Sequence, residues 1–244
     1  MRLPRRLIAP AAAALAGVAL LAALGVWQLR RLAWKEGLIA QIEARAGAAP
    51  KSLPAEADWA TLDQQAYEYR HVRFEATLER DREALVFRPS GGAAHEPGYL
   101  VLSPARLPSG AYVVVNRGFV PAALKDRALR PERAPQGPEP IAGLMRAPEA
   151  RNIFTPADDP ARESFFSRDP APVAARFGLA RAAPFIVDAD RSAPPAPGAP
   201  SGGETAIVFP NNHLSYALTW FGLAAALAGV FCAYAWRVAG GRGG

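Results

Sequence analysis

Histidine is the residue type that could most clearly do chemistry in this 244-residue sequence, and it occurs three times. His213 begins an apolar stretch, and helical spacing would place Tyr216, Ala217 and Trp220 on its face of a helix. Ionisable groups at a membrane boundary often mark function, and neutral imidazole is a common axial ligand of haem iron. His213 is therefore the candidate metal ligand. The alternative is structural, with Asn211-Asn212-His213 forming a polar cap on the first amides of a helix.

The other two histidines fit a simpler interpretation. His71 occupies the polar face of an alternating segment, and His95 lies in a predicted loop rich in glycine and proline. Both are expected to be solvated surface residues.

The motifs that are missing point away from several enzyme classes. The sequence has neither a Cys-x-x-Cys pair nor the haem-attachment form of that motif, and its one cysteine and two methionines give no soft-ligand cluster. It lacks a His-Glu-x-x-His zinc motif, a phosphate-binding glycine loop and a Gly-x-Ser-x-Gly elbow. We therefore expect a protein that is not an enzyme.

Two uncharged stretches of 23 residues each, Leu7–Leu29 and Leu214–Trp236, dominate the organisation of the chain. A helix of that length spans about 34 Å, which is enough to cross a hydrocarbon core of about 30 Å. Both are predicted transmembrane helices with aromatic residues near their ends. The alternative for the first, a cleaved signal sequence, fits less well because its apolar run is longer than a signal requires.

The distribution of charge predicts the topology. The two short tails carry five arginines and no acidic residue, whereas the segment between the spans holds 23 basic and 22 acidic residues. Basic tails are typical of cytoplasmic ends, and a nearly neutral domain argues against nucleic-acid binding. Both termini are thus predicted inside and the central domain, 30–210, outside. The start of the second span then lies level with the end of the first, so Trp27, Gln28 and Arg30 are expected neighbours of His213.

The central domain has the pattern of an α+β fold with a mostly antiparallel sheet, and a small open barrel is one form that such a sheet can take. Residues 72–78 alternate between apolar and polar, and short apolar runs separated by turn residues follow. The further predicted strands are Ala84–Phe87, Tyr99–Leu102, Tyr112–Val115, Ile141–Met145, Phe185–Asp188 and Ala206–Phe209. The clearest hairpin joins 98–104 to 110–117. One helix is predicted over Ala171–Phe177, with Asp169 as its N-cap, Pro170 first and Gly178 past its end.

The connecting segments complete the prediction. Good helix formers over 30–46 predict a helical stalk that extends the first span, followed by a loop over 51–63. Two proline-rich segments, 130–140 and 192–203, are expected to be exposed linkers.

Seven segments together resemble one family. They are 24–35 (LGVWQLRRLAWK), 68–72 (EYRHV), 98–104 (GYLVLSP), 115–121 (VNRGFVP), 167–169 (SRD), 185–189 (FIVDA) and 211–220 (NNHLSYALTW). In this order, between two predicted spans, the sequence is identified as a member of the Surfeit locus protein 1 family, whose members are assembly factors for haem-copper cytochrome c oxidase. It departs from the family at Ala76, where glycine is usual, at Pro210, where a basic residue is usual, and at Phe165-Phe166, where one aromatic is commonly Trp.

The resemblance implies a role in maturing oxidase subunit I around the insertion of haem a, together with other assembly factors. It implies His213 as a candidate haem ligand, with Trp27, Tyr216 and Trp220 beside the macrocycle. Arg30 or Arg31 would pair with its propionates.

The lack of an Arg/Ser-rich presequence favours a bacterial inner membrane over a mitochondrial one. Asn116-Arg117-Gly118 is expected to be a turn at a strand end. The alternative function is a cofactor-free membrane scaffold that docks oxidase assembly intermediates.

Overall fold

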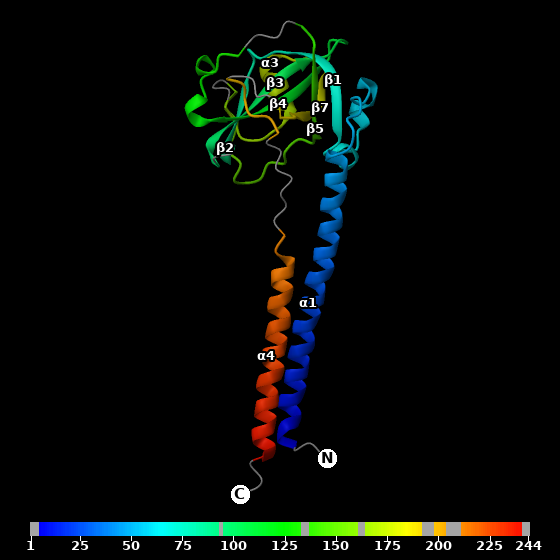
Figure 1. Cartoon of the computed structure of the whole chain (residues 1–244), viewed down its shortest axis with the longest axis vertical. Coiled ribbons are helices and arrows are strands. Elements are labelled where there is room, and N and C mark those ends of the chain that lie inside the picture. Colours follow the sequence, from blue (N-terminus) through cyan, green and yellow to red (C-terminus); the bar gives the residue numbers. More distant parts are fainter. Residues whose placement is uncertain are drawn as a thin grey trace. The chain divides into compact units, whose positions relative to one another are not determined.

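A computed structural model describes residues 5–92, 95–132, 137–160, 164–191, 198–203 and 211–240 of the chain (Figure 1). Its contacts divide the chain into two compact units. The first comprises Met1–Gln41 and Val208–Gly244, and the second comprises Ile42–Ile207. We describe them separately as the helical unit and the barrel unit.

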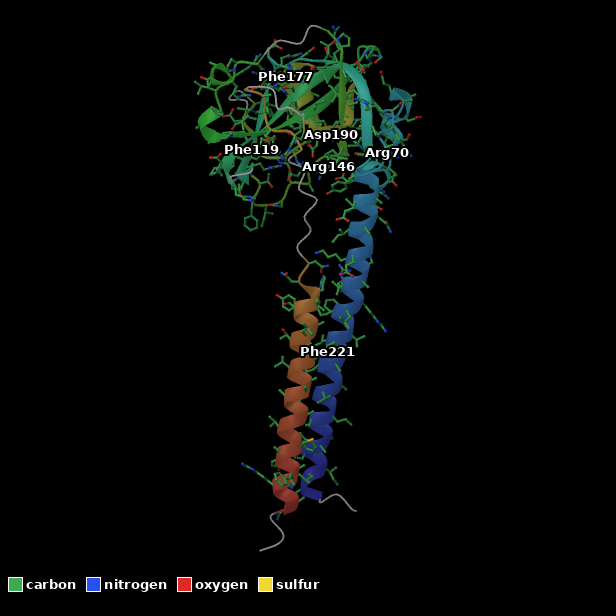
Figure 2. All side chains as sticks on the ribbon, in the orientation of Figure 1. Arg70, Phe119, Arg146, Phe177, Asp190 and Phe221 are labelled. Atoms are coloured by element: carbon green, nitrogen blue, oxygen red, sulfur yellow. The ribbon has the colours of Figure 1, made fainter. Side chains whose placement is uncertain are left out.

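The helical unit pairs α1 (Arg5–Ala46), whose last turns belong to the barrel unit, with α4 (His213–Gly240). Both sequences are rich in Ala and Leu, and within the described part of the chain these are the two helices long and apolar enough to cross a membrane. α1 includes the segment 30–46 that the sequence predicts to be a stalk. Small residues let the helices approach closely, because a Cβ on Gly17 would lie 2.7 Å from Leu227 and one on Gly25 2.7 Å from Phe221. Phe221 is labelled in Figure 2.

The barrel unit is a mixed, largely antiparallel sheet that closes on itself. Its strands are β1 (His71–Leu78), β2 (Ala84–Gly91), β3 (Glu96–Arg106), β4 (Tyr112–Pro121), β5 (Glu139–Arg146), β6 (Ser164–Phe165) and β7 (Ala182–Ala189). The strand order is β1-β5-β7-β4-β3-β2-β6, and β1 also pairs with β3. β1, β5, β7, β4 and β3 therefore form a closed ring, where the sequence suggested an open barrel.

The long strand β3 makes this closure possible. Its first part pairs with β2, whereas Ala105 and Arg106 at its end pair with Leu78 and Thr77 of β1. The predicted hairpin is confirmed, since β3 and β4 pair antiparallel from Gly98↔Pro121 to Arg106↔Tyr112. The pairings β4–β7 and β2–β6 are parallel.

Alternating side chains of these strands build the core. Trp59, Tyr67 and Phe185 meet inside the ring, and both Trp59 and Tyr67 have ring centroids 5.8 Å from that of Phe185. A second cluster includes Phe119, Phe165 and the α3 residue Val173. The predicted helix is confirmed as α3 (Pro170–Phe177), because the Asp169 carboxylate accepts the Ala171 N–H and Gly178 takes a left-handed conformation.

Several expectations for connecting segments are wrong. The predicted loop 51–63 contains a 3₁₀ helix, η1 (Glu56–Thr61), and α2 (Gln64–Tyr67) follows it. Short 3₁₀ turns η2 (Ala122–Leu124) and η3 (Arg127–Leu129) follow β4. Sequence patterns miss such pieces because a single turn leaves no periodic signal.

The prediction of exposed proline-rich linkers holds for part of their described length. In the first, the side chains of Arg130 and Glu132 are buried whereas Pro131 is exposed. In the second, Ser201 is exposed and pairs through its backbone with Phe119. The expected strand Ala206–Phe209 and residues 192–197 lie outside the described residues.

Asn116-Arg117-Gly118 lies within β4 rather than at a strand end. The register shifts there, with Leu100 opposite Phe119 and Leu102 opposite Asn116, which defines a β-bulge. Gly118 has φ +121°, and a Cβ on it would lie 2.0 Å from the Ser201 carbonyl oxygen, so glycine is required.

Candidate functional site

The candidate site of the helical unit centres on a contact between its two helices. His213 is the first residue of α4, and its Nδ1 lies 2.7 Å from Oε1 of Gln28 in α1. Gln28 is buried, with 9% of its surface exposed, and His213 is half-buried. Of the expected neighbours of His213, the structure brings Gln28 to it.

This contact decides which ring nitrogen of a neutral imidazole is available. The Gln28 carbonyl oxygen can only accept, so His213 Nδ1 carries the hydrogen and donates it. The lone pair then resides on Nε2, which has no hydrogen-bond partner among the described residues. Histidines that bind metals almost always donate their other ring N–H to such an acceptor, which fixes tautomer and orientation. The His213–Gln28 pair therefore has the arrangement of a metal-binding histidine: Nδ1–H donates to a supporting acceptor, and Nε2 keeps its lone pair.

The helix register positions the pair. Gly25 lies one turn before Gln28 on α1, and its lack of a side chain makes room for the Phe221 ring of α4. Ala217, one turn after His213, is 1% exposed. Small residues on both helices thus bring the two backbones together at the level of the polar contact.

The aromatic residues expected at the site face outward to different degrees. Trp27 and Tyr216 are 55% and 56% exposed, and Trp220 is half-buried. Arg30 and Arg31 are exposed, and the Arg31 guanidinium stacks 4.1 Å from the ring centroid of Trp34. None of these five residues contacts His213 through a hydrogen bond in the described part of the chain. They offer surface around the site rather than contacts within it.

The capping alternative for Asn211-Asn212-His213 receives limited support. The backbone carbonyl of Asn212 accepts the Tyr216 N–H at 3.1 Å, as a helix start requires. Asn211 Oδ1 is buried without a hydrogen-bond partner, and the His213 ring is directed to Gln28. Over the described residues, no side chain of the three caps a first-turn amide.

The remaining histidines differ from each other. His95 is exposed, with φ +51°, as a loop residue. The expectation of a solvated ring is wrong for His71, whose side chain is only 19% exposed. Its Nδ1 lies 3.0 Å from the Ala48 carbonyl oxygen and its Nε2 lies 2.8 Å from Asp190 Oδ2. The alternation of β1 showed which face His71 is on, but not that the Ala48 carbonyl, two residues past the end of α1, and the Asp190 carboxylate contact its ring.

The barrel unit buries a cluster of four charged residues that sequence reasoning missed. The Glu83 carboxylate accepts from Arg117 and Arg130, and Arg117 also contacts Glu132. Burial lowers the pKa of the Arg117 guanidinium, although Glu132 and Glu83 oppose that effect. These side chains are at most 7% exposed, so the cluster is a paired internal network.

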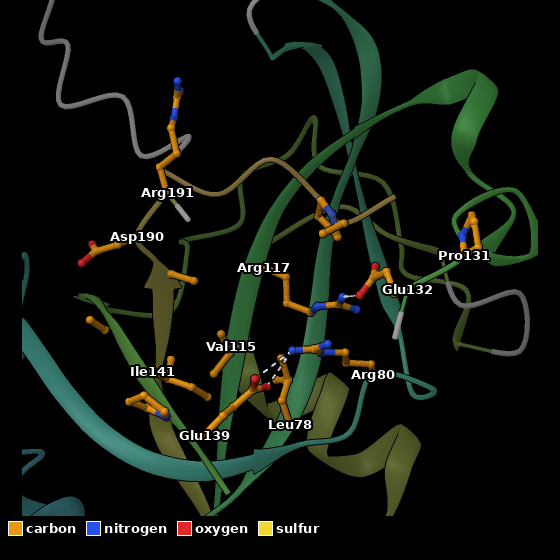
Figure 3. A pocket seen from close by; sticks show the side chains of 15 residues that line it. Leu78, Arg80, Val115, Arg117, Pro131, Glu132, Glu139, Ile141, Asp190 and Arg191 are labelled. Carbon is orange, nitrogen blue, oxygen red and sulfur yellow. Dashed lines mark hydrogen bonds and ion pairs between the residues drawn. The ribbon is translucent and has the colours of Figure 1, made fainter. Parts of the chain in front are cut away.

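A cavity of about 540 Å³ adjoins this cluster, with Arg117 and Glu132 in its lining (Figure 3). Leu78, Val115 and Ile141 supply apolar lining. Arg80 pairs with Glu139 at 2.8 Å, and Figure 3 shows this pair beside the Arg117–Glu132 pair. The described lining holds no Ser, Thr, Tyr, Cys or His. In addition, no group of three or more His, Cys, Asp or Glu side chains suited to a metal occurs among the described residues.

Comparison with known protein families gives a match over most of the chain. The model of the SURF1 family matches residues 15–225, which covers the barrel unit and part of each of the two long helices. The chain belongs to the SURF1 family. It is 32% identical over 223 residues to Surfeit locus protein 1 of Xenopus tropicalis, covering 86% of this chain and 70% of that protein. It is 31% identical over 217 residues to Surfeit locus protein 1 of Homo sapiens, covering 83% and 70%. A SURF1-like protein of Drosophila melanogaster is 34% identical over 218 residues, with 83% and 70% covered.

Both residues of the His213–Gln28 pair lie in segments that the sequence alone already singled out. His213 stands in the segment 211–220 and Gln28 in the segment 24–35, two of the stretches that carry the resemblance. Their pairing also follows from the predicted topology, which set the end of one span beside the start of the other. The buried network of Glu83, Arg130 and Glu132 had no such signal, because each residue lies in a polar connecting segment.

Proposed function

We propose that this chain is an assembly factor for haem-copper cytochrome c oxidase that holds haem a near subunit I through His213. The observation that carries the proposal is the Nδ1–H to Gln28 Oε1 contact, which leaves Nε2 available to bind iron. Haem a would supply that iron. The family resemblance supplies the choice of haem a and of the oxidase.

The residues around His213 have separate tasks in this proposal. Gln28 holds the tautomer and the ring orientation, while Gly25 keeps the helices in register. Arg30 and Arg31 supply guanidinium groups for propionates, and Arg31 would exchange its stacking on Trp34 for that pairing. Trp27, Tyr216 and Trp220 offer aromatic surface to a macrocycle.

The proposed setting is a membrane with both termini on the cytoplasmic side. α1 and α4 are the spans, and the barrel unit faces the periplasm of a bacterial inner membrane. The supporting observations are the apolar runs and the five arginines of the acid-free tails. The partners in this setting are the lipid bilayer, oxidase subunit I and other assembly factors.

A visible spectrum tests the ligand assignment directly. The full chain is purified from cells that make haem a, and haem per chain is measured for wild type and His213→Ala. We expect the variant to retain less than about a tenth of the haem, because an axial ligand is lost. His95→Ala is the matched control, since His95 is exposed. Unchanged haem content and spectrum in His213→Ala would exclude His213 as the ligand.

Gln28→Leu separates a supporting acceptor from a packing residue. The substitution keeps the side-chain volume but removes the acceptor for Nδ1–H, and a lost supporting acceptor typically costs a factor of about 10–100 in metal affinity. Gln28→Glu, which keeps an acceptor, should retain more haem than Gln28→Leu. Equal haem content in the two variants would show that Gln28 only packs.

The alternative function, a scaffold without a cofactor, is favoured by one feature of the barrel unit. Ile153 and Phe154 are 91% and 84% exposed at adjacent positions, an unusual apolar pair on a protein surface. Arg151 pairs with Asp158 across the same loop, which holds the segment in shape. If the purified chain carries no haem while Ile153→Ser/Phe154→Ser loses co-purifying subunit I, the scaffold function replaces the haem-binding one.

A further inference from the structure

A small basic cavity lies within the barrel unit, where the last turn of α1 meets the start of β1. It has a volume of about 210 Å³, and four basic residues line it: Arg45, Lys51, Arg70 and His71. The rest of the described lining is alanine, with no carboxylate. Figure 2 labels Arg70 and Asp190 in this unit.

Neutral groups hold the two arginines of this basic cavity. Arg45 donates to the Gln65 carbonyl oxygen at 2.8 Å, and Arg70 donates to the Ala66 carbonyl oxygen at 3.3 Å. Neither has a carboxylate partner among the described residues. By contrast, Arg88 and Arg146 elsewhere in the unit form ion pairs with Glu149 and Glu68. The guanidinium groups of the cavity are therefore positioned without being neutralised.

His71 shapes the wall of the cavity. Its two ring nitrogens are occupied by the Ala48 carbonyl oxygen and by Asp190, the one carboxylate that contacts the lining residues in the described chain. Lys51 is anchored through its backbone, since its N–H donates to the His71 carbonyl and its own carbonyl accepts from Arg73. Three cationic groups, those of Arg45, Lys51 and Arg70, remain available to a ligand.

We propose that this basic cavity binds a phosphate group. Two guanidinium forks and one ammonium supply charge-assisted donors to several oxygens of a tetrahedral anion. The same chemistry could come from a soluble phosphate compound or from the headgroup of an anionic phospholipid. The site is independent of His213 and of haem, so it extends the proposed function without resting on it.

A different explanation makes a contrary prediction. Arg45 lies in the last turn of α1, where basic side chains offset the negative end of the helix dipole. If offsetting the helix dipole is the only role of these charges, the cavity should bind phosphate no more tightly than another anion at equal ionic strength.

The test uses the full chain in neutral detergent and inorganic phosphate as the probe. Phosphate is titrated by calorimetry against chloride at constant ionic strength. We expect binding to the wild type and at least a tenfold weaker affinity in Lys51→Gln/Arg70→Gln, because two charged donors are lost. Arg106→Gln/Arg127→Gln is the control with the same change of charge, since both arginines are exposed outside the cavity. Its affinity should stay within about twofold of wild type.

Nanodiscs distinguish the two sources of phosphate. A higher thermal midpoint in phosphatidylglycerol than in phosphatidylcholine, lost in Lys51→Gln/Arg70→Gln alone, assigns the site to a lipid headgroup. Binding of inorganic phosphate without that preference assigns it to a soluble compound. Circular dichroism checks that the variants are folded. Equal binding by wild type and both double variants, or no binding of either probe, overturns the proposal.

Discussion

The helical unit and the barrel unit differ in the polar side chains that they bury. Among the described residues of the helical unit, Gln28 is the one polar residue that is buried as a whole, and its uncharged amide pairs with the His213 ring. The barrel unit buries full charges, with Glu83 between Arg117 and Arg130. In the barrel, each charge has a partner that offsets its loss of water.

The difference indicates which contact is structural and which is available for chemistry. The barrel cluster uses its donors and acceptors on itself, so it fixes the connection after β4 but presents little to a ligand. The His213–Gln28 pair uses one ring nitrogen and leaves the other. A polar pair between apolar helices that keeps an unused lone pair is the better candidate for a site.

Glu83→Ala should produce the largest effect on stability. It leaves Arg117 and Arg130 buried next to the single carboxylate of Glu132, and breaking a buried ion pair typically costs about 3–5 kcal/mol. In a unit of this size the thermal midpoint should fall by roughly 10 °C. Circular dichroism of the full chain in detergent measures it.

The control for this prediction is Glu75→Ala on β1, whose side chain is exposed and should shift the midpoint by no more than about 2 °C. A shift equally small in Glu83→Ala would mean that the buried charges are solvated. The distinction between the two units would then disappear.

Much of the architecture could be predicted because it depends on local patterns. Alternation along 72–78 predicted β1, and Asp169, Pro170 and Gly178 predicted α3 with its caps. The closed ring depends on the length of β3 and on its pairing with β1 beyond the end of β2. No local pattern encodes that relation.

The candidate site was predictable to a similar extent. Helical spacing and topology brought the ends of the two spans together, which gave Gln28 as a neighbour of His213. The tautomer that leaves Nε2 available required the interatomic geometry. The basic cavity was missed because Arg45, Lys51 and Arg70 come from three separate segments of the chain, and each residue alone resembles a solvated surface charge.

Close approach of backbones offers the next contrast between the units. Gly118→Ala in the barrel must fit a Cβ 2.0 Å from the Ser201 carbonyl at φ +121°, which should cost roughly 2–4 kcal/mol. Gly25→Ala in α1 meets only the Phe221 ring, a side chain that can rotate, and alanine favours the helix. We expect Gly118→Ala to lower the thermal midpoint of the barrel and Gly25→Ala to leave it unchanged.

Gly178→Ala provides the control for conformational strain, because its φ of +61° is left-handed but no atom lies within 4 Å of the added Cβ. It should cost about 1 kcal/mol, in keeping with strain alone. A Gly25→Ala variant that destabilised the barrel as much as Gly118→Ala would show that the units do not respond separately.

The smallest expected effect concerns acid. Burial of Glu149 opposes its ionisation, but the Arg168 N–H and the Arg88 guanidinium outweigh that effect, so its pKa lies below the ordinary value of 4.5. A lowered folded-state pKa means that the carboxylate stabilises the fold above pH 4.5 and that this contribution is lost as the pH falls through the folded-state value. Glu149→Gln should therefore be less stable than wild type at pH 7, and the difference should shrink below pH 4.5. Because the Glu149 side chain is 38% exposed, solvent screens the interaction, and 1 M salt should reduce the difference in stability further.

The His213–Gln28 contact should show no such salt dependence, because the Gln28 amide carries no charge. The test compares the stability of Gln28→Leu with that of wild type at pH 7, at low salt and in 1 M salt. A stability difference that changes with salt would place charge at the helical contact and contradict the contrast between the units.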